Sequence, residues 1–387
     1  MTYGILKDRK RDEARVITTP ADVKAIVERG HFVIAERGSG EKAGFDDESY
    51  ALAGARIADS PNEIFEECDV VGKVKEFLPS EFGLIREGQI LLGCIHPAAN
   101  PKEVDALLEK KCIAFSAEDS HRYGSVNSEA AGKVGALFAL ESIFTLNCGG
   151  GKICGLVGAP KMNILVLGGG AAGVGALDVL SALGANCTVM DINYGRLKEL
   201  DLRYGGRVCT AFSSKERIAE ILPYMDIVIN AVKWQKERRD FLIDRKMLGL
   251  MRKGSVIVDI SNDAPGAVET SRETHFDSPR YIEEGVVHFA VSNLPSAAAN
   301  SVSIAYSAQM LPMILSLLSD GVKETCIRNG YYRRSLTAYE GYLTHEETSA
   351  VQKRPWIKPE DALGIRDEKL DYAPPASTSR SRNHYKM

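Results

Sequence analysis

The stretch between residues 163 and 191 constrains the fold of this chain more than any other. The apolar run Asn163–Leu167 leads into Gly-Gly-Gly-Ala-Ala-Gly at 168–173, which is followed by an Ala- and Leu-rich segment. A second apolar run then ends at Asp191. This is the order strand, G-x-G-x-x-G turn, helix, strand and acidic residue that is typical of a dinucleotide-binding βαβ unit. The sequence therefore predicts a parallel sheet with helices on its faces.

Each residue of this fingerprint has an expected role. Gly168 permits the tight turn, Gly170 lets the backbone approach a pyrophosphate, and Gly173 lets helix and strand pack closely. We expect the pyrophosphate to bind the N–H groups at the start of the helix, around Ala171. Asp191 is expected to accept hydrogen bonds from the adenosine ribose and to repel a 2′-phosphate. The predicted cofactor is therefore NAD rather than NADP.

The composition excludes several classes of protein. A chain of 387 residues is long enough for two domains, and a formal net charge of −4 gives no reason to expect a nucleic-acid partner. We expect no membrane-spanning segment and no signal peptide, because the sequence shows no apolar run long enough for a bilayer and its first fifteen residues lack an apolar core. The eight cysteines lack the spacing of metal sites or disulfide frameworks. We expect a reduced, cytoplasmic protein that acts on a small molecule, with no metal and no membrane partner.

Strands and helices alternate along most of the chain, which favours an α/β fold with doubly wound sheets. A long helix is predicted from Ser128 to about Leu146, leading into the fingerprint region. A second apolar helix is predicted over 297–318, interrupted by Pro312, and would return the chain to the first domain. The catalytic cleft is expected at the carboxyl ends of both sheets, between the two domains.

Several charged or polar residues stand next to predicted strands. Lys73 and Lys75 end an apolar strand and, being two residues apart, are expected on the same face. His96 ends another strand, Arg15 lies in the loop before the first helix, and Asp263 follows a strand of the fingerprint domain. Each has an ordinary interpretation on its own: a solvated strand end, a hydrogen-bonded loop histidine or a turn-forming aspartate.

Together with their neighbours, these residues form a series of motifs. The motifs are Glu13–Val16 with Thr18–Pro20, Lys73–Glu76, His96–Ala99, Ser128–Gly132, Met190–Asn193, Gly254–Asp259 and Gly285–His288. In order and context they resemble the alanine dehydrogenase / pyridine nucleotide transhydrogenase family, from residue 4 to about residue 365.

The resemblance implies a particular arrangement of two Rossmann-like, doubly wound domains. An NAD-binding domain, residues 129–296, is inserted into a discontinuous substrate domain formed by residues 1–128 and 297–371. The remaining segment, 372–387, is rich in Pro, Ser and Arg and is expected to be a disordered tail. A homo-oligomer is also expected from the resemblance.

The resemblance also implies roles for individual residues in the substrate domain and near the nicotinamide. Arg15 and Lys75 would grip the carboxylate and the carbonyl oxygen of a 2-oxo acid. His96 would be the general acid/base. Asp263 would be the essential carboxylate near the nicotinamide, orienting or polarising water or ammonia.

Two further residues are implied as contacts to the cofactor, Asn293 beside the nicotinamide ring and Ser128 at the pyrophosphate. The implied chemistry is the reversible oxidative deamination of L-alanine, or a related amino acid, to the 2-oxo acid (pyruvate) and ammonia. A hydride passes to NAD while His96 moves protons.

Four positions or segments depart from the pattern of alanine dehydrogenases. These are 117–127, 233–240, 296–301 and Cys94, which stands where those enzymes usually have an aromatic residue. A smaller residue there could open room for a larger substrate side chain. The substrate is therefore left open between alanine and a larger amino acid.

Three other functions stay open at this point. An opine-type imine reductase, such as N5-(carboxyethyl)ornithine synthase, would join pyruvate to the amine of another amino acid and would use the room beside Cys94. An NAD-binding subunit of a transhydrogenase would not need the acid/base pair. A catalytically silent NAD-binding protein would need none of the four charged residues.

Overall fold

The structure, a computed structural model, describes residues 1–234, 238–262 and 266–374, so that Asp263 lies outside the described residues. The chain divides into two compact units. Unit 1 comprises Met1–Ser125 and Ala299–Met387, and unit 2 comprises Val126–Ala298. The unit boundaries therefore fall at 125/126 and 298/299, where the sequence placed them at 128/129 and 296/297.

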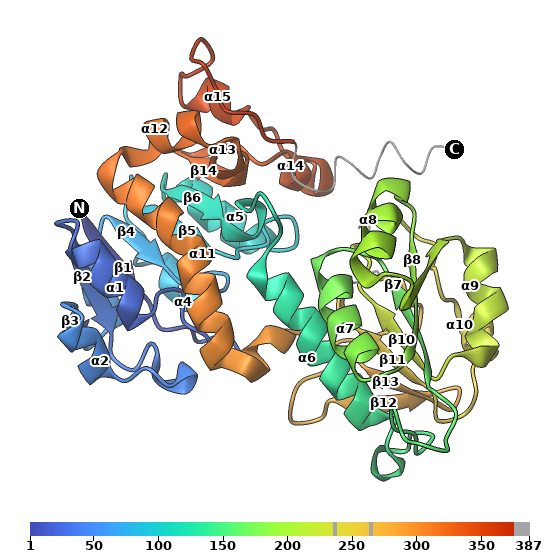
Figure 1. The fold of residues 1–387 in the computed structure, drawn as a ribbon. Coiled ribbons are helices and arrows are strands. Elements are labelled where there is room, and N and C mark those ends of the chain that lie inside the picture. Colours follow the sequence, from blue (N-terminus) through green and yellow to red (C-terminus); the bar gives the residue numbers. More distant parts are fainter. Residues whose placement is uncertain (235–237, 263–265, 375–387) are drawn as a thin grey trace. The chain divides into compact units, whose positions relative to one another are not determined.

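Unit 1 contains an eight-stranded sheet in the order β15-β14-β6-β5-β4-β1-β2-β3 (Figure 1). Strands β1 to β6 are parallel, whereas β14 is antiparallel to both β6 and β15. The chain order reverses between β1 and β4, and this position is the switch point of the sheet. The bounds are β1 (Thr2–Ile5), β2 (Phe32–Glu36), β3 (Arg56–Ala58), β4 (Val70–Gly72), β5 (Ile90–Gly93), β6 (Ile113–Ser116), β14 (Leu336–Tyr339) and β15 (Tyr342–Leu343).

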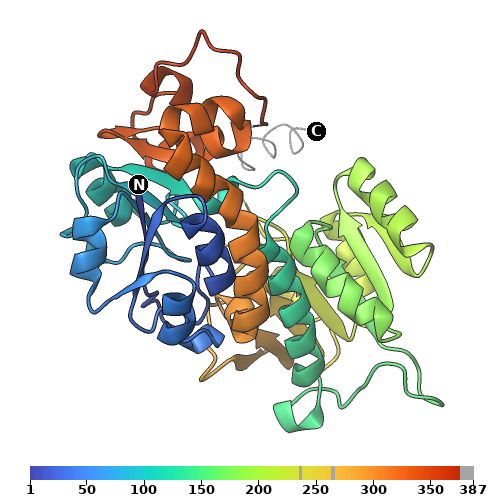
Figure 2. The ribbon, with the colours of Figure 1, turned by 60° about the vertical axis from the view of Figure 1, so that its left-hand side comes forward.

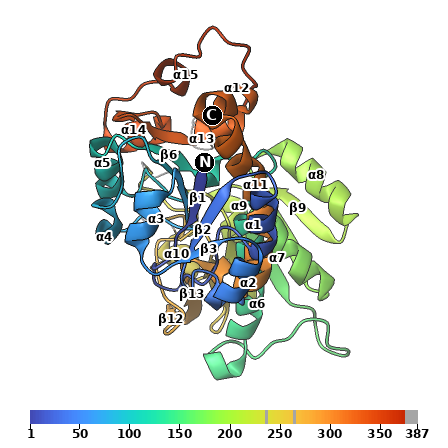
Figure 3. The ribbon, with the colours of Figure 1, turned by 90° about the vertical axis from the view of Figure 1, so that its left-hand side faces the viewer.

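Helices cover both faces of this sheet. One core, containing Ile26 and Ile314, packs α1 and α11 on one face, and another, containing Phe65 and Leu107, packs α3 and α5 on the other. Helix α11 lies beside α1 (Figures 2 and 3). The bounds are α1 (Pro20–Val27), α2 (Asp47–Leu52), α3 (Pro61–Glu67), α4 (Pro79–Phe82), α5 (Pro101–Glu109), α11 (Ala299–Ser319), α12 (Gly321–Arg328), α13 (Gly330–Ser335), α14 (Glu346–Gln352) and α15 (Pro359–Ala362), with 3-10 turns η1 (Glu41–Ala43) and η2 (Ala117–Asp119).

Unit 2 contains a seven-stranded sheet in the order β12-β13-β11-β10-β7-β8-β9, in which only β12 is antiparallel to its neighbour. Helices α6 to α8 supply residues to one core and α9 and α10 to another. The strands are β7 (Asn163–Leu167), β8 (Asn186–Asp191), β9 (Val208–Phe212), β10 (Ile227–Asn230), β11 (Val256–Asp259), β12 (Arg280–Glu283) and β13 (Val286–Phe289). The helices are α6 (Val126–Ser142), α7 (Ala171–Ala182), α8 (Tyr194–Tyr204), α9 (Lys215–Ile221) and α10 (Arg245–Leu248), with 3-10 turns η3 (Thr145–Asn147), η4 (Leu222–Tyr224) and η5 (Leu294–Ala298).

Helices α6 and α7 lie side by side with their backbones in contact (Figure 2). A Cβ atom added to Gly132 would lie 1.8 Å from the carbonyl oxygen of Ala172, and one added to Gly175 would lie 2.2 Å from that of Glu129. No side chain larger than a hydrogen fits at either contact. The two glycines therefore allow the short distance between α6 and α7.

The predicted fold class, α/β with two Rossmann-like doubly wound sheets, is confirmed by these topologies. The prediction that Pro312 interrupts the second long helix is wrong, because α11 continues through it to Ser319. The buried neighbours Met310, Met313 and Ile314 anchor the helix in the core of unit 1. This packing offsets the lost backbone hydrogen bond of the proline.

The expectation that the chain holds no apolar segment of membrane-spanning length needs correction. The helical stretch Leu294–Ser319 is long and apolar enough by composition. Half of its most apolar window is buried within the structure, and Leu317 and Leu318 belong to the core of unit 1. The core helix of a soluble protein passes the same test, so this stretch is weak evidence for a membrane span.

Candidate active site

Three of the predicted side chains lie in loops at one edge of the unit 1 sheet. Arg15 is in the loop after β1, Lys75 follows β4 and His96 follows β5. Because β1 and β4 flank the switch point and β5 adjoins β4, the loops that follow these three parallel strands lie at the same edge of the sheet. Desolvation and then the charge of Arg15 lower the pKa of Lys75. Desolvation by the surrounding protein and then the charge of Lys75 lower the pKa of His96. The structure thus brings the three within electrostatic range of one another.

Arg15 is oriented by a carboxylate two residues away. Its Nε donates to Glu13 Oε1 at 2.9 Å and its Nη2 to Glu13 Oε2 at 2.6 Å, a bidentate pair that is almost completely buried. Burial alone would raise the pKa of Glu13, but the charge and hydrogen bonds of Arg15 outweigh it and lower the pKa to about 2. Glu13 is therefore ionised, and it fixes the plane of the guanidinium.

Lys75 supplies a second positive charge. Its backbone N–H donates to Asp8 Oδ2 at 2.8 Å, which anchors the loop after β4. Its ammonium makes no hydrogen bond or ion pair with the residues that the structure describes, whereas the neighbouring cation Lys10 is paired with Glu76. Arg15 and Lys75 together therefore favour an anionic ligand, and a carboxylate suits the guanidinium geometry.

Lys73 and Lys75, which were expected on the same face of a strand, have different surroundings. Both lie beyond the end of strand β4 at Gly72. Lys73 is fully buried, with Nζ 3.0 Å from Glu81 Oε2 and 3.9 Å from Asp8 Oδ1. Lys73 is therefore committed to an internal ion pair, and only Lys75 remains a candidate for binding a ligand.

His96 has an unusual backbone and a specific partner. Its φ is +42°, in the left-handed region, and its N–H donates to Glu118 Oε1 at 2.7 Å. The same oxygen lies 3.4 Å from the imidazole Nδ1, while 49% of the side chain stays exposed. The surrounding protein, and next the charge of Lys75, hold the pKa of His96 below its ordinary value of 6.5. The imidazole is therefore neutral at neutral pH and can accept a proton.

Cys94 is buried against a residue of α11. Its Sγ lies 3.3 Å from Oη of Tyr306, a fully buried residue of α11, and Cys94 itself is only 7% exposed. Burial raises the pKa of Cys94 to about 12, so that the thiol stays neutral. A side chain from a distant part of the sequence thus packs against Cys94.

In unit 2 the fingerprint residues form the turn between β7 and α7. Gly168 has φ +89°, and an added Cβ would lie 2.9 Å from the carbonyl oxygen of Ala231. A Cβ on Gly173 would lie 1.9 Å from the carbonyl oxygen of Gly168. By contrast, no atom lies within 4 Å of a Cβ built on Gly170, directly before the first helical residue Ala171. The start of α7 therefore has the open backbone that a pyrophosphate needs.

Asp191 ends β8 beside this turn. Its Oδ2 accepts the N–H of Gly169 at 2.8 Å, and its Oδ1 accepts the N–H of Asn193 at 2.8 Å. The carboxylate thus braces the glycine turn. Each oxygen keeps a second lone pair for a ligand hydroxyl. The ribose contact remains a prediction.

The other predicted cofactor contacts are also in unit 2. Ser128 is exposed in the first turn of α6. Asn293 has φ +69° and directly precedes η5. Contacts of either residue with a cofactor remain predictions, as does the role of Asp263, which the described parts of the chain do not include.

The sequence did not indicate some residues that shape the unit 1 site. Glu118 contacts His96 and Tyr306 contacts Cys94, and both come from segments that carry no recognisable motif. Glu13 was within a quoted motif, but its pairing with Arg15 was not predicted. The roles of Glu118 and Tyr306 depend on contacts between distant segments, whereas Glu13 pairs with Arg15 within one loop.

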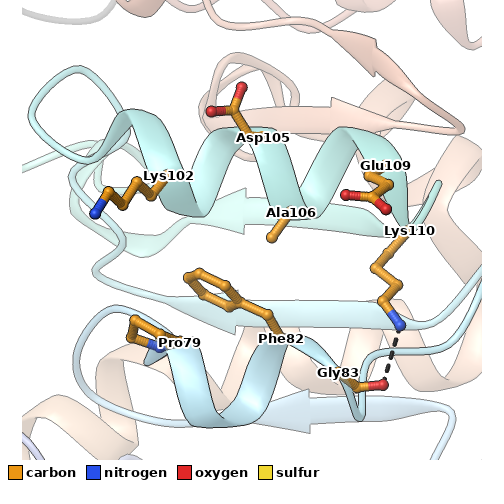
Figure 4. A pocket seen from close by; sticks show the side chains of 8 residues that line it. All are labelled: Pro79, Phe82, Gly83, Lys102, Asp105, Ala106, Glu109 and Lys110. Carbon is orange, nitrogen blue, oxygen red and sulfur yellow. Dashed lines mark hydrogen bonds between the residues drawn. The ribbon is translucent and has the colours of Figure 1, made fainter.

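A surface hollow of about 510 Å³ lies between α4 and α5 (Figure 4). The ring of Phe82 faces Ala106 across it, and Lys110 Nζ donates to the carbonyl oxygen of Gly83 at 3.0 Å. None of the predicted site residues lines it. Among the residues described, no group of three or more His, Cys, Asp or Glu side chains could hold a metal ion.

Comparisons with known proteins agree along nearly the whole chain. Residues 4–128 match the family model "Alanine dehydrogenase/PNT, N-terminal domain", and residues 139–346 match its C-terminal counterpart. Alanine dehydrogenase from Methanococcus maripaludis is 34% identical over 371 residues, covering 94% of this chain and 100% of that protein. Alanine dehydrogenase 2 from Staphylococcus aureus is 35% identical over 373 residues, with the same coverage of both chains.

Solved structures support the same relationship. An L-alanine dehydrogenase superposes with a TM-score of 0.84 at 31% identity, covering 91% of this chain and 99% of that one. A transhydrogenase from Sinorhizobium meliloti, 22% identical and covering 89% of this chain and 99% of its own, shares the fold with a TM-score of 0.73. This chain belongs to the alanine dehydrogenase / pyridine nucleotide transhydrogenase family.

Proposed function

We propose that this protein is an NAD-dependent amino-acid dehydrogenase that interconverts L-alanine with pyruvate and ammonia. The observation that carries the proposal is the convergence of Arg15, Lys75 and His96 at the switch point of unit 1. Two cations and a neutral imidazole match the needs of a 2-oxo acid that gains or loses an amine. The relatives at 34% and 35% identity carry the name alanine dehydrogenase.

The roles of the three residues follow from their chemistry. Arg15, whose guanidinium is oriented by Glu13, binds the substrate carboxylate. Lys75 has an ammonium without a protein partner among the described residues, and it polarises the carbonyl oxygen of the 2-oxo acid. Both interactions align the α-carbon for reaction.

His96 moves the protons of the reaction. The neutral imidazole accepts a proton at a ring nitrogen when water adds during deamination, and it returns a proton in the direction of amination. Glu118, next to Nδ1, stabilises the imidazolium while it exists. In our proposal Asp263 assists by orienting water or ammonia.

The residues of unit 2 fit a dinucleotide, because the start of α7 is open at Gly170 and Asp191 stands at the end of the neighbouring strand. We assign the pyrophosphate to the turn 168–173 with Ser128, the ribose to Asp191 and the nicotinamide side to Asn293. When bound, NAD supplies the hydride acceptor in deamination and the hydride donor in amination.

The test is NADH oxidation with pyruvate, measured once with ammonium and once with a panel of amino acids as the amine. Turnover with ammonium alone, and alanine as the product, supports the proposal. Absence of turnover with ammonium under any condition that supports NADH binding would refute it.

An opine-type imine reductase remains the second candidate, and the same assay detects it as turnover that requires an amino acid such as ornithine. The structure gives it less support than the sequence did, because Tyr306 lies against Cys94 where room for a second substrate was expected. A cytoplasmic location and a homo-oligomeric state belong to the same proposal. Light scattering of the full chain after size-exclusion chromatography tests the second of these.

A further inference from the structure

The backbone of His96 is held in a conformation that a histidine rarely adopts. Its φ of +42° lies in the left-handed region, where a Cβ atom crowds the backbone. Such a conformation persists only where surrounding contacts determine it. The contacts around His96 therefore show what sets the position of the imidazole.

The segment after His96 is held by side-chain amides. Asn100 Nδ2 donates to the carbonyl oxygen of Ile95 at 2.9 Å and to that of His96 at 3.3 Å. Gln352, the last residue of α14, donates from Nε2 to the carbonyl oxygen of Pro97 at 2.7 Å and to that of Ala98 at 3.3 Å. One residue from near the C-terminus of the chain thus binds the backbone directly after the proposed acid/base.

The amide of Gln352 has a defined orientation. Its Oε1 is buried and has no hydrogen-bond partner among the residues described, whereas its Nε2 faces two carbonyl oxygens. The reverse orientation would place Oε1 against both carbonyl oxygens and would be repulsive. Gln352 therefore acts as a donor.

Glu118, which binds the N–H of His96, lies in a segment that is held from the N-terminal end of α14. The N–H of His96 binds Glu118, and the next residue, Asp119, accepts a hydrogen bond from His345 Nε2 at 3.1 Å. His345 is the N-cap of α14, and its Nδ1 accepts the N–H of Thr348 at 3.4 Å. Because Nδ1 accepts, the proton of the neutral ring is on Nε2, where it can be donated to Asp119.

Helix α14 therefore contacts both segments that fix His96. Its N-cap residue, His345, binds η2, which carries Glu118, and its last residue, Gln352, binds the backbone at Pro97 and Ala98. The helix lies beside α5 (Figures 1 and 3), to which Arg354 is joined by an ion pair with Asp105. All of these elements belong to unit 1.

We propose that α14 is a positioning element for His96, acting through His345 at its start and Gln352 at its end. Neither residue touches the substrate. Together they keep His96 in its left-handed backbone conformation and hold Glu118 against its N–H. This inference rests on the proposed function for its kinetic consequences, but the placement of the imidazole can be measured without turnover.

The sharpest variant is Gln352→Glu, which keeps the shape of the side chain and replaces the donor by an acceptor that faces two carbonyl oxygens. We expect kcat to fall between about 10- and 100-fold, the range for a misplaced catalytic group, while the KM values for pyruvate and NADH stay within about twofold. The pH dependence of kcat/KM should also shift, because the environment of His96 changes.

A second variant, His345→Asn, separates the two roles of His345. Asparagine is a good N-cap and preserves the start of α14, but its shorter side chain does not reach Asp119. It should reproduce the direction of the Gln352→Glu effect. The matched control is Ser349→Ala, which removes the hydrogen bond of 2.6 Å from Ser349 Oγ to the carbonyl oxygen of Arg354. That bond belongs to the same helix but reaches neither segment around His96.

The readout independent of turnover is the titration of His96 in the full chain, followed by NMR with selective labelling of the seven histidines. A changed His96 titration in Gln352→Glu and His345→Asn, with an unchanged one in Ser349→Ala, is the expected result. The inference is overturned if all three variants leave His96 unchanged, or if Ser349→Ala has the same effect as the other two. If the native protein shows no turnover with pyruvate and ammonium, the proposed function fails while this readout still decides the role of α14.

Discussion

The two units share one sheet design but build their candidate sites from different parts of the polypeptide. In unit 2 the site is mostly backbone, because a tight turn, two close approaches and an open helix start all depend on glycine. In unit 1 the site consists of side chains from three loops, each fixed by a second side chain. A backbone-built site needs a short local motif, whereas a side-chain-built site needs contacts between distant segments.

This difference carries a physical consequence. Unit 1 contains several buried ionisable side chains, among them Glu13, Arg15, Lys73 and Glu103. Buried charges cost free energy unless they are paired or neutralised. Unit 1 should therefore be sensitive to changes of charge and unit 2 to changes of backbone geometry.

The largest effect is expected for His96→Ala. Removal of the proposed general acid/base should lower kcat by at least about 100-fold, while the affinity for NADH is retained because the fingerprint lies in unit 2. Steady-state kinetics and NADH fluorescence titration measure the two quantities. Asp263→Ala should behave in the same way, and unchanged turnover in either variant would remove that residue from the mechanism.

A substitution at Gly173 should damage unit 2 through its backbone. The Cβ of alanine would lie 1.9 Å from the carbonyl oxygen of Gly168, so β7 and α7 must move apart. We expect a loss of stability of about 3 kcal/mol and a loss of NADH binding. Urea unfolding measures the loss of stability, and fluorescence titration measures the loss of NADH binding.

Gly170→Ala is the control, since its Cβ meets no atom within 4 Å, and it should fold normally. Equal stability of the Gly173 and Gly170 variants would contradict the proposed close approach.

A change of stability of opposite sign, confined to part of the pH range, is expected for Glu103→Gln in unit 1. Glu103 is 3% exposed; its Oε1 accepts the N–H of Phe77, and within the described chain its Oε2 has no partner. Burial, against the opposing effect of the Phe77 N–H, raises its pKa from 4.5 to about 9. Between these values the folded chain keeps a proton that the unfolded chain releases, so Glu103 lowers stability as the pH rises through this window.

Glutamine keeps the acceptor for Phe77 and cannot ionise. The variant should therefore gain stability by up to about 3 kcal/mol at pH 7 and nothing below pH about 4.5. Thermal unfolding across this pH range measures the gain. Asp105→Asn, on the exposed side of α5, is the control and should show no gain. A pH-independent difference between Glu103→Gln and the native chain would show that Glu103 is ionised in the fold.

The same contrast explains what could be predicted from the sequence. The fingerprint was interpretable because its turn, helix start and acid are within 29 residues of one another, between 163 and 191. The edge strands β9 and β12 were not predicted. Most of their residues are at least partly exposed, and the two apolar residues of β12 stand between Arg280 and Glu283. Lys73 was grouped with Lys75 because the strand was expected to continue past Gly72.

In unit 1 the candidates Arg15, Lys75 and His96 came from the family resemblance, and the residues that position them did not. Glu118, Tyr306 and His345 become neighbours of the site only after the chain folds. Their types carry no signal on their own, because a buried tyrosine or histidine is more often part of an ordinary core. A side-chain-built site can therefore be only partly predicted from a single sequence.

The central claim is that unit 1 binds the 2-oxo acid and unit 2 binds the dinucleotide. Calorimetric titration of two variants tests it most directly, with NADH first and then with pyruvate at saturating NADH. Lys75→Gln leaves no protein partner unpaired among the described residues. It should lower the affinity for pyruvate by about 10- to 100-fold and leave the affinity for NADH unchanged. Asp191→Ala should lower the affinity for NADH by about 10-fold, and by more than it lowers the affinity for NADPH, while the affinity for pyruvate stays unchanged. If either variant weakens both ligands equally, the two sites are not divided between the units as proposed.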